Sequence, residues 1–371
     1  MRRFHRLSGS SIFALLIFAI ASRQPSGAAQ SASATADKSA AAKGTLERVM
    51  VHGRSLEGNL EGDSPDRPVV VYLPPSYGTD TNRRYPVLYF LHGYTATAEA
   101  YVKSLAIPDS IDRAIAAGAR EMIVVIPDAF TKYSGSMFSN SPTTGFWETF
   151  VADDLTAYID KRYRTIASRN ARGLAGHSMG GYGTMRIGMK QAHAFGALYA
   201  MSSCCLMNDP AAGRGGAAGR GQPPAPGRGD GATRGDAAGR AAGQGRGGGM
   251  ANALSAQAAA WAPNPKNPPQ FFDLPTKDGE LQPLVAAKWV ANSPLVFVDQ
   301  YVPSLRSMRA IALDIGDRDP FVGTNRQLAD ALTRLDVPHT FDVYEGDHGN
   351  RIRERFEMHV LPFFSRQLTG P

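Results

Sequence analysis

The feature that most constrains this chain is a series of short apolar runs that alternate with longer segments of helical periodicity. Several runs are apolar without alternation, which is typical of strands buried on both faces of a mostly parallel sheet. The runs fall at residues 47–52, 68–73, 86–91, 122–126, 173–176, 197–202, 309–315 and 340–344. Helical patterns occupy residues 148–162, 179–191, 323–335 and 350–367. This order predicts an α/β fold with a mostly parallel central sheet flanked by helices.

Length and composition indicate a folded protein of enzyme size. The chain has 371 residues, of which 43% are hydrophobic and 20% charged, so it is too apolar to be disordered throughout. Its net charge is +7, but three N-terminal arginines and six arginines set against three aspartates at 209–249 carry most of that charge. The remainder is nearly neutral, and we therefore expect no nucleic-acid partner.

The two cysteines, Cys204 and Cys205, are adjacent in the chain. Neighbouring cysteines can close only a strained small ring, so we expect both to be reduced and packed at the end of a strand. No two histidines at helical spacing stand beside a carboxylate, and the cysteines lack a second pair. The sequence therefore predicts neither a metal nor another cofactor.

Residues 1–29 have the pattern of an export signal. Three arginines precede the apolar run at 11–21, which is shorter than the roughly 20 residues that a bilayer span needs. We expect the protein to be exported to the periplasm or the cell exterior without a stable membrane span, with an uncleaved membrane anchor as the alternative. Residues 30–44 are rich in alanine and serine without periodicity, which predicts a disordered tether.

A second low-complexity segment interrupts the α/β pattern at about residues 209–250. Glycine, alanine, arginine and proline alternate there, and such a stretch buries too little apolar surface to offset its ordering entropy. We expect a disordered insertion within a single domain that spans residues 45–371. A lid over the mouth of the site is the alternative to an inert loop.

The strongest local signal is the segment Gly176-His177-Ser178-Met179-Gly180, a G-x-S-x-G pattern between a predicted strand and a predicted helix. In such a turn the serine backbone is strained and the neighbouring chain passes too close for a Cβ, so glycines are required. The pattern alone arises easily by chance in a glycine-rich chain. Its position between strand and helix favours Ser178 as a nucleophile over a purely structural turn.

A serine hydroxyl needs a base, and in this type of fold the partners follow in the order acid, then histidine. His348 lies in the loop after the last predicted strand, where an imidazole can reach the turn; His339, just before that strand, is the rival. For the acid, the loop after the preceding strand offers Asp314, Asp317 and Asp319. We expect Asp319, because Asp314 is still within the strand and Asp317 is close enough to its end to shape the turn.

The oxyanion that forms when a serine attacks a carbonyl needs prearranged donors. The backbone N–H groups of Met179, just after the nucleophile, and of Tyr94, after the strand-ending His92-Gly93, are the candidates. Trp147 and Tyr94 are candidates for the pocket lining, although a tryptophan on an amphipathic helix belongs more often to the core.

These segments resemble the esterase D family of α/β hydrolases, which includes S-formylglutathione hydrolases, feruloyl and acetylxylan esterases, enterochelin-type esterases and mycolyltransferases. The resemblance extends from about residue 47 to the end of the chain. It rests on 71–75 (VYLPP), 84–93 (RYPVLYFLHG), 147–150 (WETF), 176–183 (GHSMGGYG), Gly316 with Asp319, and Gly346 with His348. It implies an α/β-hydrolase fold, a triad of Ser178, Asp319 and His348, and an oxyanion hole formed by Tyr94 and Met179.

Residues and resemblance together predict an exported serine carboxylesterase that hydrolyses a small-molecule or polysaccharide-linked ester through an acyl-serine intermediate. Export argues against the S-formylglutathione hydrolase branch, whose substrate is cytosolic. One alternative is an acyltransferase of mycolyltransferase type, which passes the acyl group to a sugar or lipid alcohol. Another is a catalytically silent secreted binding protein on a hydrolase scaffold. Nothing in the sequence bears on the oligomeric state.

Overall fold

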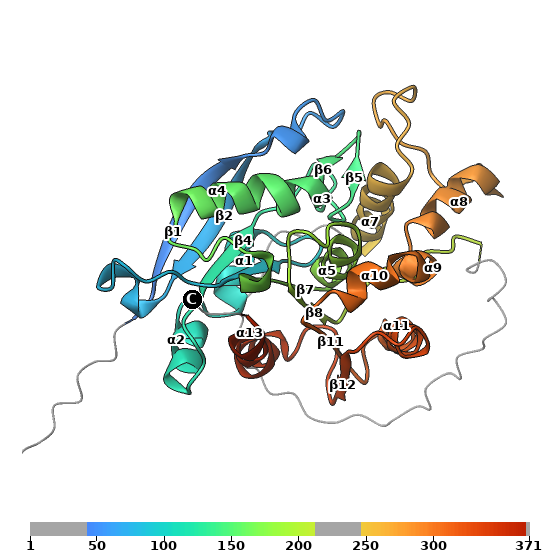
Figure 1. Ribbon diagram of the computed structural model, residues 1–371. Coiled ribbons are helices and arrows are strands. Elements are labelled where there is room, and N and C mark those ends of the chain that lie inside the picture. Colours follow the sequence, from blue (N-terminus) through green and yellow to red (C-terminus); the bar gives the residue numbers. More distant parts are fainter. Residues whose placement is uncertain (1–42, 212–245, 369–371) are drawn as a thin grey trace, which may run out of the picture. The chain divides into compact units, whose positions relative to one another are not determined.

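The computed structural model describes residues 43–211 and 246–368, and in them an eight-stranded sheet has the order β1-β2-β4-β3-β7-β8-β11-β12 (Figure 1). All eight predicted strands are present, each with ends within two residues of the expected ones. Within this sheet β2 runs antiparallel to both of its neighbours, β1 and β4, and the other neighbouring strands are parallel. The strands are β1 (Thr45–His52), β2 (Asp66–Leu73), β3 (Val87–Leu91), β4 (Ile123–Pro127), β7 (Arg172–His177), β8 (Ala197–Met201), β11 (Ala310–Gly316) and β12 (Thr340–Tyr344).

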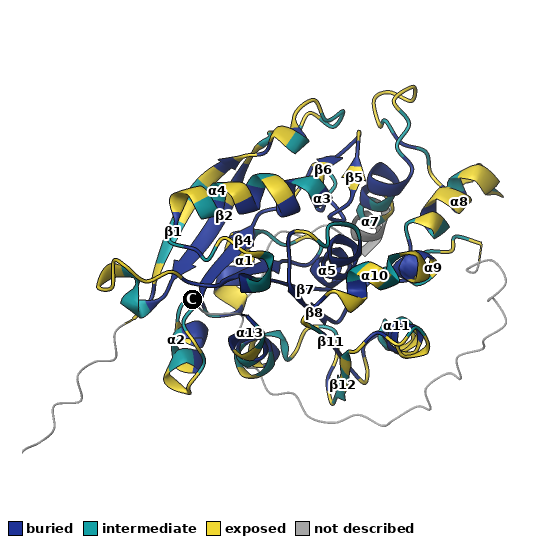
Figure 2. Cartoon of the chain, viewed as in Figure 1, coloured by how far each residue is buried: buried dark blue, intermediate teal, exposed yellow. Residues whose placement is uncertain are grey.

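The central strands are buried on both faces. In β3, Tyr89 and Leu91 contribute to one apolar cluster, whereas Leu88 and Phe90 contribute to a second. A strand that faces two cores has no solvent side, which explains its continuous apolar run. Figure 2 shows these strands as a buried layer between helices whose outer faces are exposed.

Helices cover both faces of the sheet, with α4 on one side and α2 and α13 on the other (Figure 1). Those that pack with Leu88 and Phe90 are α1 (Ala98–Ser104), α2 (Asp109–Ala116), α12 (Ile352–Arg355) and α13 (Leu361–Gln367). The other cluster contains buried side chains from α3 (Trp147–Thr149), α4 (Leu155–Arg162), α5 (Met179–Lys190) and α11 (Val322–Arg334). A π-helical turn joins α3 to α4, and another joins α12 to α13. None of the helices that the structure describes is long and apolar enough to cross a lipid bilayer.

The segment after the predicted insertion carries elements that the sequence patterns did not predict. They are α7 (Arg246–Trp261), α8 (Pro283–Ala291), α9 (Pro294–Phe297), α10 (Val302–Arg306) and the hairpin of β9 (Thr276–Lys277) and β10 (Glu280–Leu281); a second short hairpin, β5 (Asn140–Ser141) with β6 (Gly145–Phe146), precedes α3. The helix α7 begins at Arg246, within the last residues of the predicted insertion, and it buries Ala258, Ala259 and Trp261 in the core.

Most of the remaining low-complexity sequence lies outside the described residues. The predicted export signal at 1–29 lies wholly outside them, as do residues 212–245 of the predicted insertion. Of the predicted tether only Lys43 and Gly44 are described, and the Gly44 N–H donates to Asp112 Oδ1 over 3.0 Å. These expectations therefore stay predictions.

The parallel strands end along one edge of the sheet, and the loops at this edge carry the residues singled out from the sequence. Ser178 directly follows β7, Asp319 lies in the loop after β11, and His348 lies in the loop after β12. Because β7, β8, β11 and β12 are consecutive in the sheet, their loops are neighbours. The topology thus brings together residues as far as 170 positions apart in the chain.

Two glycines allow α5 to pack directly against the ends of β3 and β7. A Cβ on Gly176 would lie 2.5 Å from the carbonyl carbon of Gly180. A Cβ on Gly180 would lie 2.0 Å from the carbonyl oxygen of Leu91. Both obstacles are backbone atoms that cannot rotate away, so neither position accepts a side chain.

We expect Gly180→Ala to lower the free energy of unfolding by at least about 3 kcal/mol, or to prevent folding, because the new methyl group overlaps the backbone of β3. The matched control is Gly323→Ala, also at the second residue of a helix, where a Cβ would meet nothing within 4 Å. Its stability should equal that of the wild type or exceed it by up to about 1 kcal/mol. Urea unfolding of the three proteins measures both effects, and equal losses in the two variants would contradict the packing argument.

Candidate active site

Ser178 lies between β7 and α5 with a strained backbone. Its φ of 58° and ψ of −113° are rare for any residue other than glycine. The Ser178 N–H donates to the Met201 carbonyl over 3.0 Å, and the Ser178 carbonyl accepts from the N–H groups of Tyr182 and Cys204 at 3.0 and 3.3 Å. This is the geometry of a nucleophile elbow, which presents the side chain at the tip of the strand.

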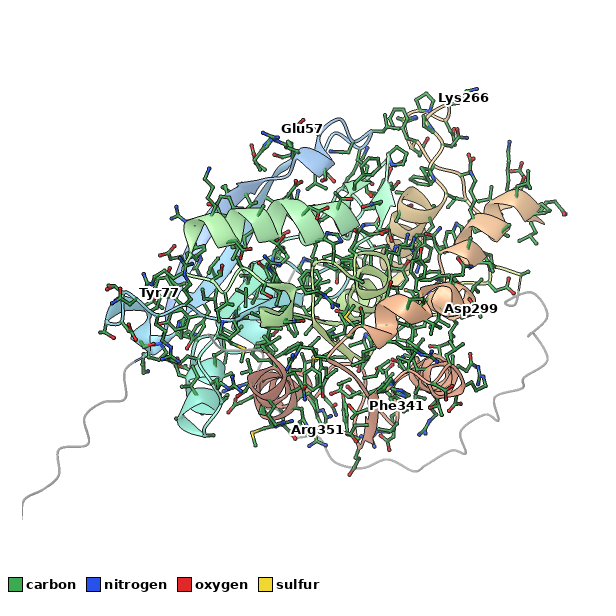
Figure 3. The ribbon with its side chains drawn as sticks, viewed as in Figure 1. Glu57, Tyr77, Lys266, Asp299, Phe341 and Arg351 are labelled. Atoms are coloured by element: carbon green, nitrogen blue, oxygen red, sulfur yellow. The ribbon has the colours of Figure 1, made fainter. Side chains whose placement is uncertain are left out.

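The structure brings Ser178, His348 and Asp319 into one hydrogen-bonded series. His348 Nε2 lies 2.9 Å from Ser178 Oγ, and His348 Nδ1 lies 2.8 Å from Asp319 Oδ2. A carboxylate only accepts, so Nδ1 carries the proton and Nε2 is free to accept one from the hydroxyl. In the sequence His348 lies between Phe341, on β12, and Arg351, both of which are labelled in Figure 3.

The two other aspartates near the end of β11 have structural partners. Asp314 is fully buried within the strand, where it accepts hydrogen bonds from Arg355 and Tyr199, each over 2.8 Å. Asp317 Oδ1 accepts the Gly346 N–H over 2.9 Å and thus shapes the turn between the two loops. The preference for Asp319 over both therefore agrees with the geometry.

His339, the rival base, lies at the opposite end of β12 from His348. Its Nδ1 is 2.9 Å from the carbonyl oxygen of Val337, just before the strand begins. Because β12 runs parallel to β7, this end lies at the edge of the sheet away from Ser178. His339 therefore does not belong to the site.

The loop after β3 passes beside the nucleophile. A Cβ on Gly93 would lie 3.5 Å from the Cβ of Ser178, and a Cβ on Gly135 would lie 2.7 Å from both the Tyr94 ring and the Met179 sulfur. Tyr94 and Met179 are thus neighbours next to Ser178. The Met179 N–H, at the first position of α5, is one of the donors that a helix leaves without an intrahelical partner.

A buried histidine fixes the peptide group that precedes Tyr94. The Ala129 N–H donates to His92 Nε2 over 2.8 Å, so the imidazole proton is on Nδ1, which donates to the Gly93 carbonyl over 2.8 Å. The Gly93-Tyr94 peptide is trans, so the Tyr94 N–H points opposite to the carbonyl that His92 holds. Burial lowers the pKa of His92, which favours the neutral imidazole that this pattern requires.

The structure places Trp147 in the core and not in the pocket lining. Trp147 is 1% exposed, its indole N–H donates to the Thr144 carbonyl over 2.8 Å, and its ring stacks edge-on with Phe150. This burial favours a place in the core over a contact with substrate, because the side chain has almost no exposed surface. Tyr94 is half-buried, and its hydroxyl donates to the Tyr133 carbonyl over 3.0 Å.

Hydrogen bonds keep the Asp319 carboxylate ionised despite its burial. Burial by itself would raise the pKa of Asp319, but hydrogen bonds from His348, the Phe321 N–H and Ser202 together bring that pKa below its usual value. The Phe321 ring also lies edge-on to the His348 ring, with centroids 5.3 Å apart. Sequence reasoning did not single out Phe321 or Ser202, although both lie in loops at the ends of neighbouring strands.

The two cysteines lie beside the site as free thiols. They follow β8, as expected, with Cys204 buried and Cys205 half-buried. Within residues 43–211 and 246–368, no group of three or more histidine, cysteine, aspartate or glutamate side chains is placed to hold a metal ion.

His177, the residue before the nucleophile, is buried and neutral. Burial, together with the nearby His348 imidazole, lowers the pKa of His177 from its ordinary 6.5 to about 4. Its Nε2 lies 2.7 Å from the His348 carbonyl oxygen, and its Nδ1 lies 2.7 Å from the hydroxyl of Tyr101. The sequence analysis treated His177 only as part of the motif, because nothing in the motif indicates what the imidazole contacts.

Comparison with known proteins identifies the family. The family described as "Putative esterase" matches residues 64–356. Esterase Rv1288 of Mycobacterium tuberculosis is 36% identical over 128 residues, which are 33% of this chain and 26% of that protein. An endo-1,4-beta-xylanase/feruloyl esterase of Xylanibacter ruminicola is 32% identical over 130 residues, which are 34% of this chain and 18% of that protein. The matched region thus spans about a quarter or less of these relatives.

Two solved structures show a similar fold over most of their length. A ferulic acid esterase has a TM-score of 0.60 and 23% identity, covering 87% of this chain and 98% of its own. An S-formylglutathione hydrolase from Staphylococcus aureus has a TM-score of 0.54 and 14% identity, covering 88% and 99%. The α/β-hydrolase fold expected from the sequence is therefore confirmed.

The low pKa of His177 makes stability depend on pH. Between pH 6.5 and about 4 the unfolded chain binds a proton at this residue that the folded chain does not, so stability falls as the pH falls through this range. From pH 6.5 to pH 5 the loss from this residue should be about 1.5 kcal/mol. We expect urea unfolding of His177→Gln to show a pH-dependent loss smaller than that of the wild type by this amount. Equal losses in the two proteins would mean that His177 is already charged, or exposed, in the folded state.

Proposed function

The chain belongs to this esterase family, and we propose that it is an exported serine carboxylesterase that forms an acyl-enzyme on Ser178. The observation that supports this most directly is the hydrogen-bonded series from Ser178 Oγ through His348 to Asp319, with contacts of 2.9 and 2.8 Å. A hydroxyl in this series gains a base whose orientation is fixed by a buried carboxylate.

In the first half of the reaction His348 Nε2 takes the proton of the Ser178 hydroxyl as its oxygen attacks the ester carbonyl. The resulting imidazolium is stabilised by Asp319, which keeps its negative charge throughout. The tetrahedral intermediate collapses when His348 gives its proton to the alkoxide, and the alcohol leaves. Ser178 then carries the acyl group.

The negative charge of the intermediate requires donors that are in place before the reaction. The backbone N–H groups of Met179 and Tyr94 serve this purpose, the first at the start of α5 and the second on a peptide group whose carbonyl is bonded by His92. Both are main-chain groups, so their direction depends on the backbone and not on the side chains of these residues.

In the second half His348 activates a water molecule, which attacks the acyl-serine. The same donors stabilise the second oxyanion, and Ser178 recovers its proton as the acid leaves. The His348 side chain is about one-third exposed, so the site has the opening to solvent that this step requires.

We propose a carboxylic ester of a small molecule or of a polysaccharide as the substrate, with export directed by residues 1–29. The likeness to a feruloyl esterase and the identity to an endo-1,4-beta-xylanase/feruloyl esterase favour an aromatic acyl group linked to a plant polysaccharide as the first ester to test. Exporting the enzyme would bring it to polymers that cannot enter the cell.

We expect Ser178→Ala to lower kcat for short p-nitrophenyl esters about 10⁶-fold, because the residual rate no longer passes through an acyl-enzyme.

Asp319→Asn should lower kcat about 10⁴-fold by favouring the wrong imidazole tautomer. Asp317→Asn is the control for the acid: its carboxylate bonds the Gly346 N–H and not His348, and kcat should stay within about fivefold of the wild type. Similar rates for wild type and Ser178→Ala would reject the mechanism, and a larger loss in Asp317→Asn than in Asp319→Asn would reject the assignment of the acid.

Product analysis separates hydrolysis from acyl transfer. With methyl ferulate as the acyl donor and xylose or glycerol added in excess, we expect ferulic acid as the main product by liquid chromatography. A transferase would give mainly the feruloyl ester of the added alcohol. If that product dominated, the acyltransferase alternative would replace hydrolysis.

A further inference from the structure

Two buried side chains connect the loops that lie on either side of Ser178. Tyr101 belongs to α1, and its hydroxyl lies 2.7 Å from His177 Nδ1. His177 Nε2 lies 2.7 Å from the carbonyl oxygen of His348. Tyr101 is 7% exposed and His177 5% exposed, so both hydrogen bonds are shielded from solvent.

The direction of each hydrogen bond follows from the acceptor at its end. The His348 carbonyl only accepts, so His177 Nε2 must carry a proton. In the neutral imidazole Nδ1 then accepts, and the Tyr101 hydroxyl is the donor. The series therefore runs in one direction, from Tyr101 through His177 to the backbone of His348.

The Tyr101 hydroxyl also contacts the loop that carries Tyr94. A Cβ on Gly93 would lie only 2.7 Å from the Tyr101 hydroxyl oxygen, so this hydroxyl packs directly against the backbone of that loop. Gly93 is joined to Tyr94 by the peptide group that His92 holds. The Tyr101 hydroxyl therefore contacts both the loop that carries Tyr94 and His177, which bonds to the His348 loop.

We propose that Tyr101 and His177 act as a positioning pair that holds the His348 loop at a fixed distance from the Tyr94 loop. This inference rests on the proposed function, because it assigns His348 and the Tyr94 N–H their parts in ester hydrolysis. Neither Tyr101 nor His177 touches the reacting atoms in this assignment. Each acts through the backbone of the residue that does.

The His348 loop needs such an attachment because it follows the edge strand of the sheet. Among the described residues β12 pairs with β11 alone, and Gly349 and Asn350, which follow His348, are exposed. Asp317 and Arg318 bond to the backbone of Gly346, and Asp319 bonds to the His348 side chain. His177 adds a contact from the other side of the site, to the His348 carbonyl. A displacement of about 1 Å at a catalytic group can cost about 10²-fold in rate, so loss of this contact should reduce turnover.

The neutral state of His177 suits this position. The His177 and His348 rings lie with centroids 4.9 Å apart, and His348 becomes positively charged during each cycle. A second cation at this distance would oppose that charge. The pKa of His177, lowered to about 4 by burial and by His348, keeps the pair free of this repulsion at neutral pH.

The test uses the full chain with three changes at the pair. His177→Leu removes both hydrogen bonds and keeps an apolar side chain of similar size. His177→Gln retains an N–H donor and an oxygen acceptor. Tyr101→Phe removes only the hydroxyl, and it keeps the test valid if the leucine variant does not fold. Tyr199→Phe is the matched control, since it removes another buried hydroxyl, bonded to Asp314 and away from both loops.

We expect His177→Leu and Tyr101→Phe to lower kcat for p-nitrophenyl acetate by 10- to 100-fold with KM changed less than threefold, because positioning acts on the chemical steps. His177→Gln should recover kcat to within fivefold of the wild type, and Tyr199→Phe should leave kcat unchanged. The double variant of Tyr101→Phe and His177→Leu should be no slower than the slower single variant, because the two residues act as one unit.

Several results would overturn the proposal. They are kcat within twofold of the wild type in folded Tyr101→Phe, a glutamine variant as slow as the leucine variant, or effects that multiply in the double variant. A loss of kcat in Tyr199→Phe equal to that in Tyr101→Phe would point to a general loss of packing. Failure of the proposed function is a separate result, since it would appear as wild-type rates equal to those of Ser178→Ala.

Discussion

The close approach of α5 to the ends of β3 and β7 is the contact on which the rest of this structure depends. It exists because Gly176 and Gly180 carry no side chains, and any Cβ at either position would overlap backbone atoms. The same approach forces Ser178 into a left-handed backbone conformation, which is held by hydrogen bonds to β8 and to the loop after it. The strain at one residue is thus supported by packing across three strands, as expected where a structure must present a reactive group in a fixed direction.

Around this turn the site is assembled mainly through backbone groups. Two neutral, buried imidazoles bond to carbonyls on either side of the serine: His92 to Gly93, and His177 to His348. In both cases the second ring nitrogen is occupied by a donor, the Ala129 N–H or the Tyr101 hydroxyl, which fixes the tautomer. Ser178, His348 and Asp319, by contrast, form their series through side chains alone. Fixing the loops through their carbonyls leaves the catalytic imidazole free to move its proton.

Much of the fold and of the site follows from local sequence patterns. All eight strands of the sheet were expected, and the central ones are the clearest because strands buried on both faces appear as continuous apolar runs. Ser178 was identifiable because glycines on both sides mark a turn that admits no side chain. Asp319 was preferred to Asp317 because it lies further from the end of the strand, and the structure shows Asp317 bonded within the turn. The helices from residue 246 to 306 were missed, since their alanines and prolines directly follow a low-complexity stretch and form no clear amphipathic pattern.

The sequence alone therefore determined the order of the strands, the nucleophile, and the loops from which its partners come, because each depends on a pattern of residues near one another in the chain. Tertiary structure decided which side chains those residues meet. Nothing along the chain indicates that Tyr101 and His177, 76 positions apart, share a hydrogen bond, or that Trp147 turns into the core. Contacts between distant segments depend on how strands are ordered in the sheet and on how helices pack across it. The periodicity of a single sequence indicates neither.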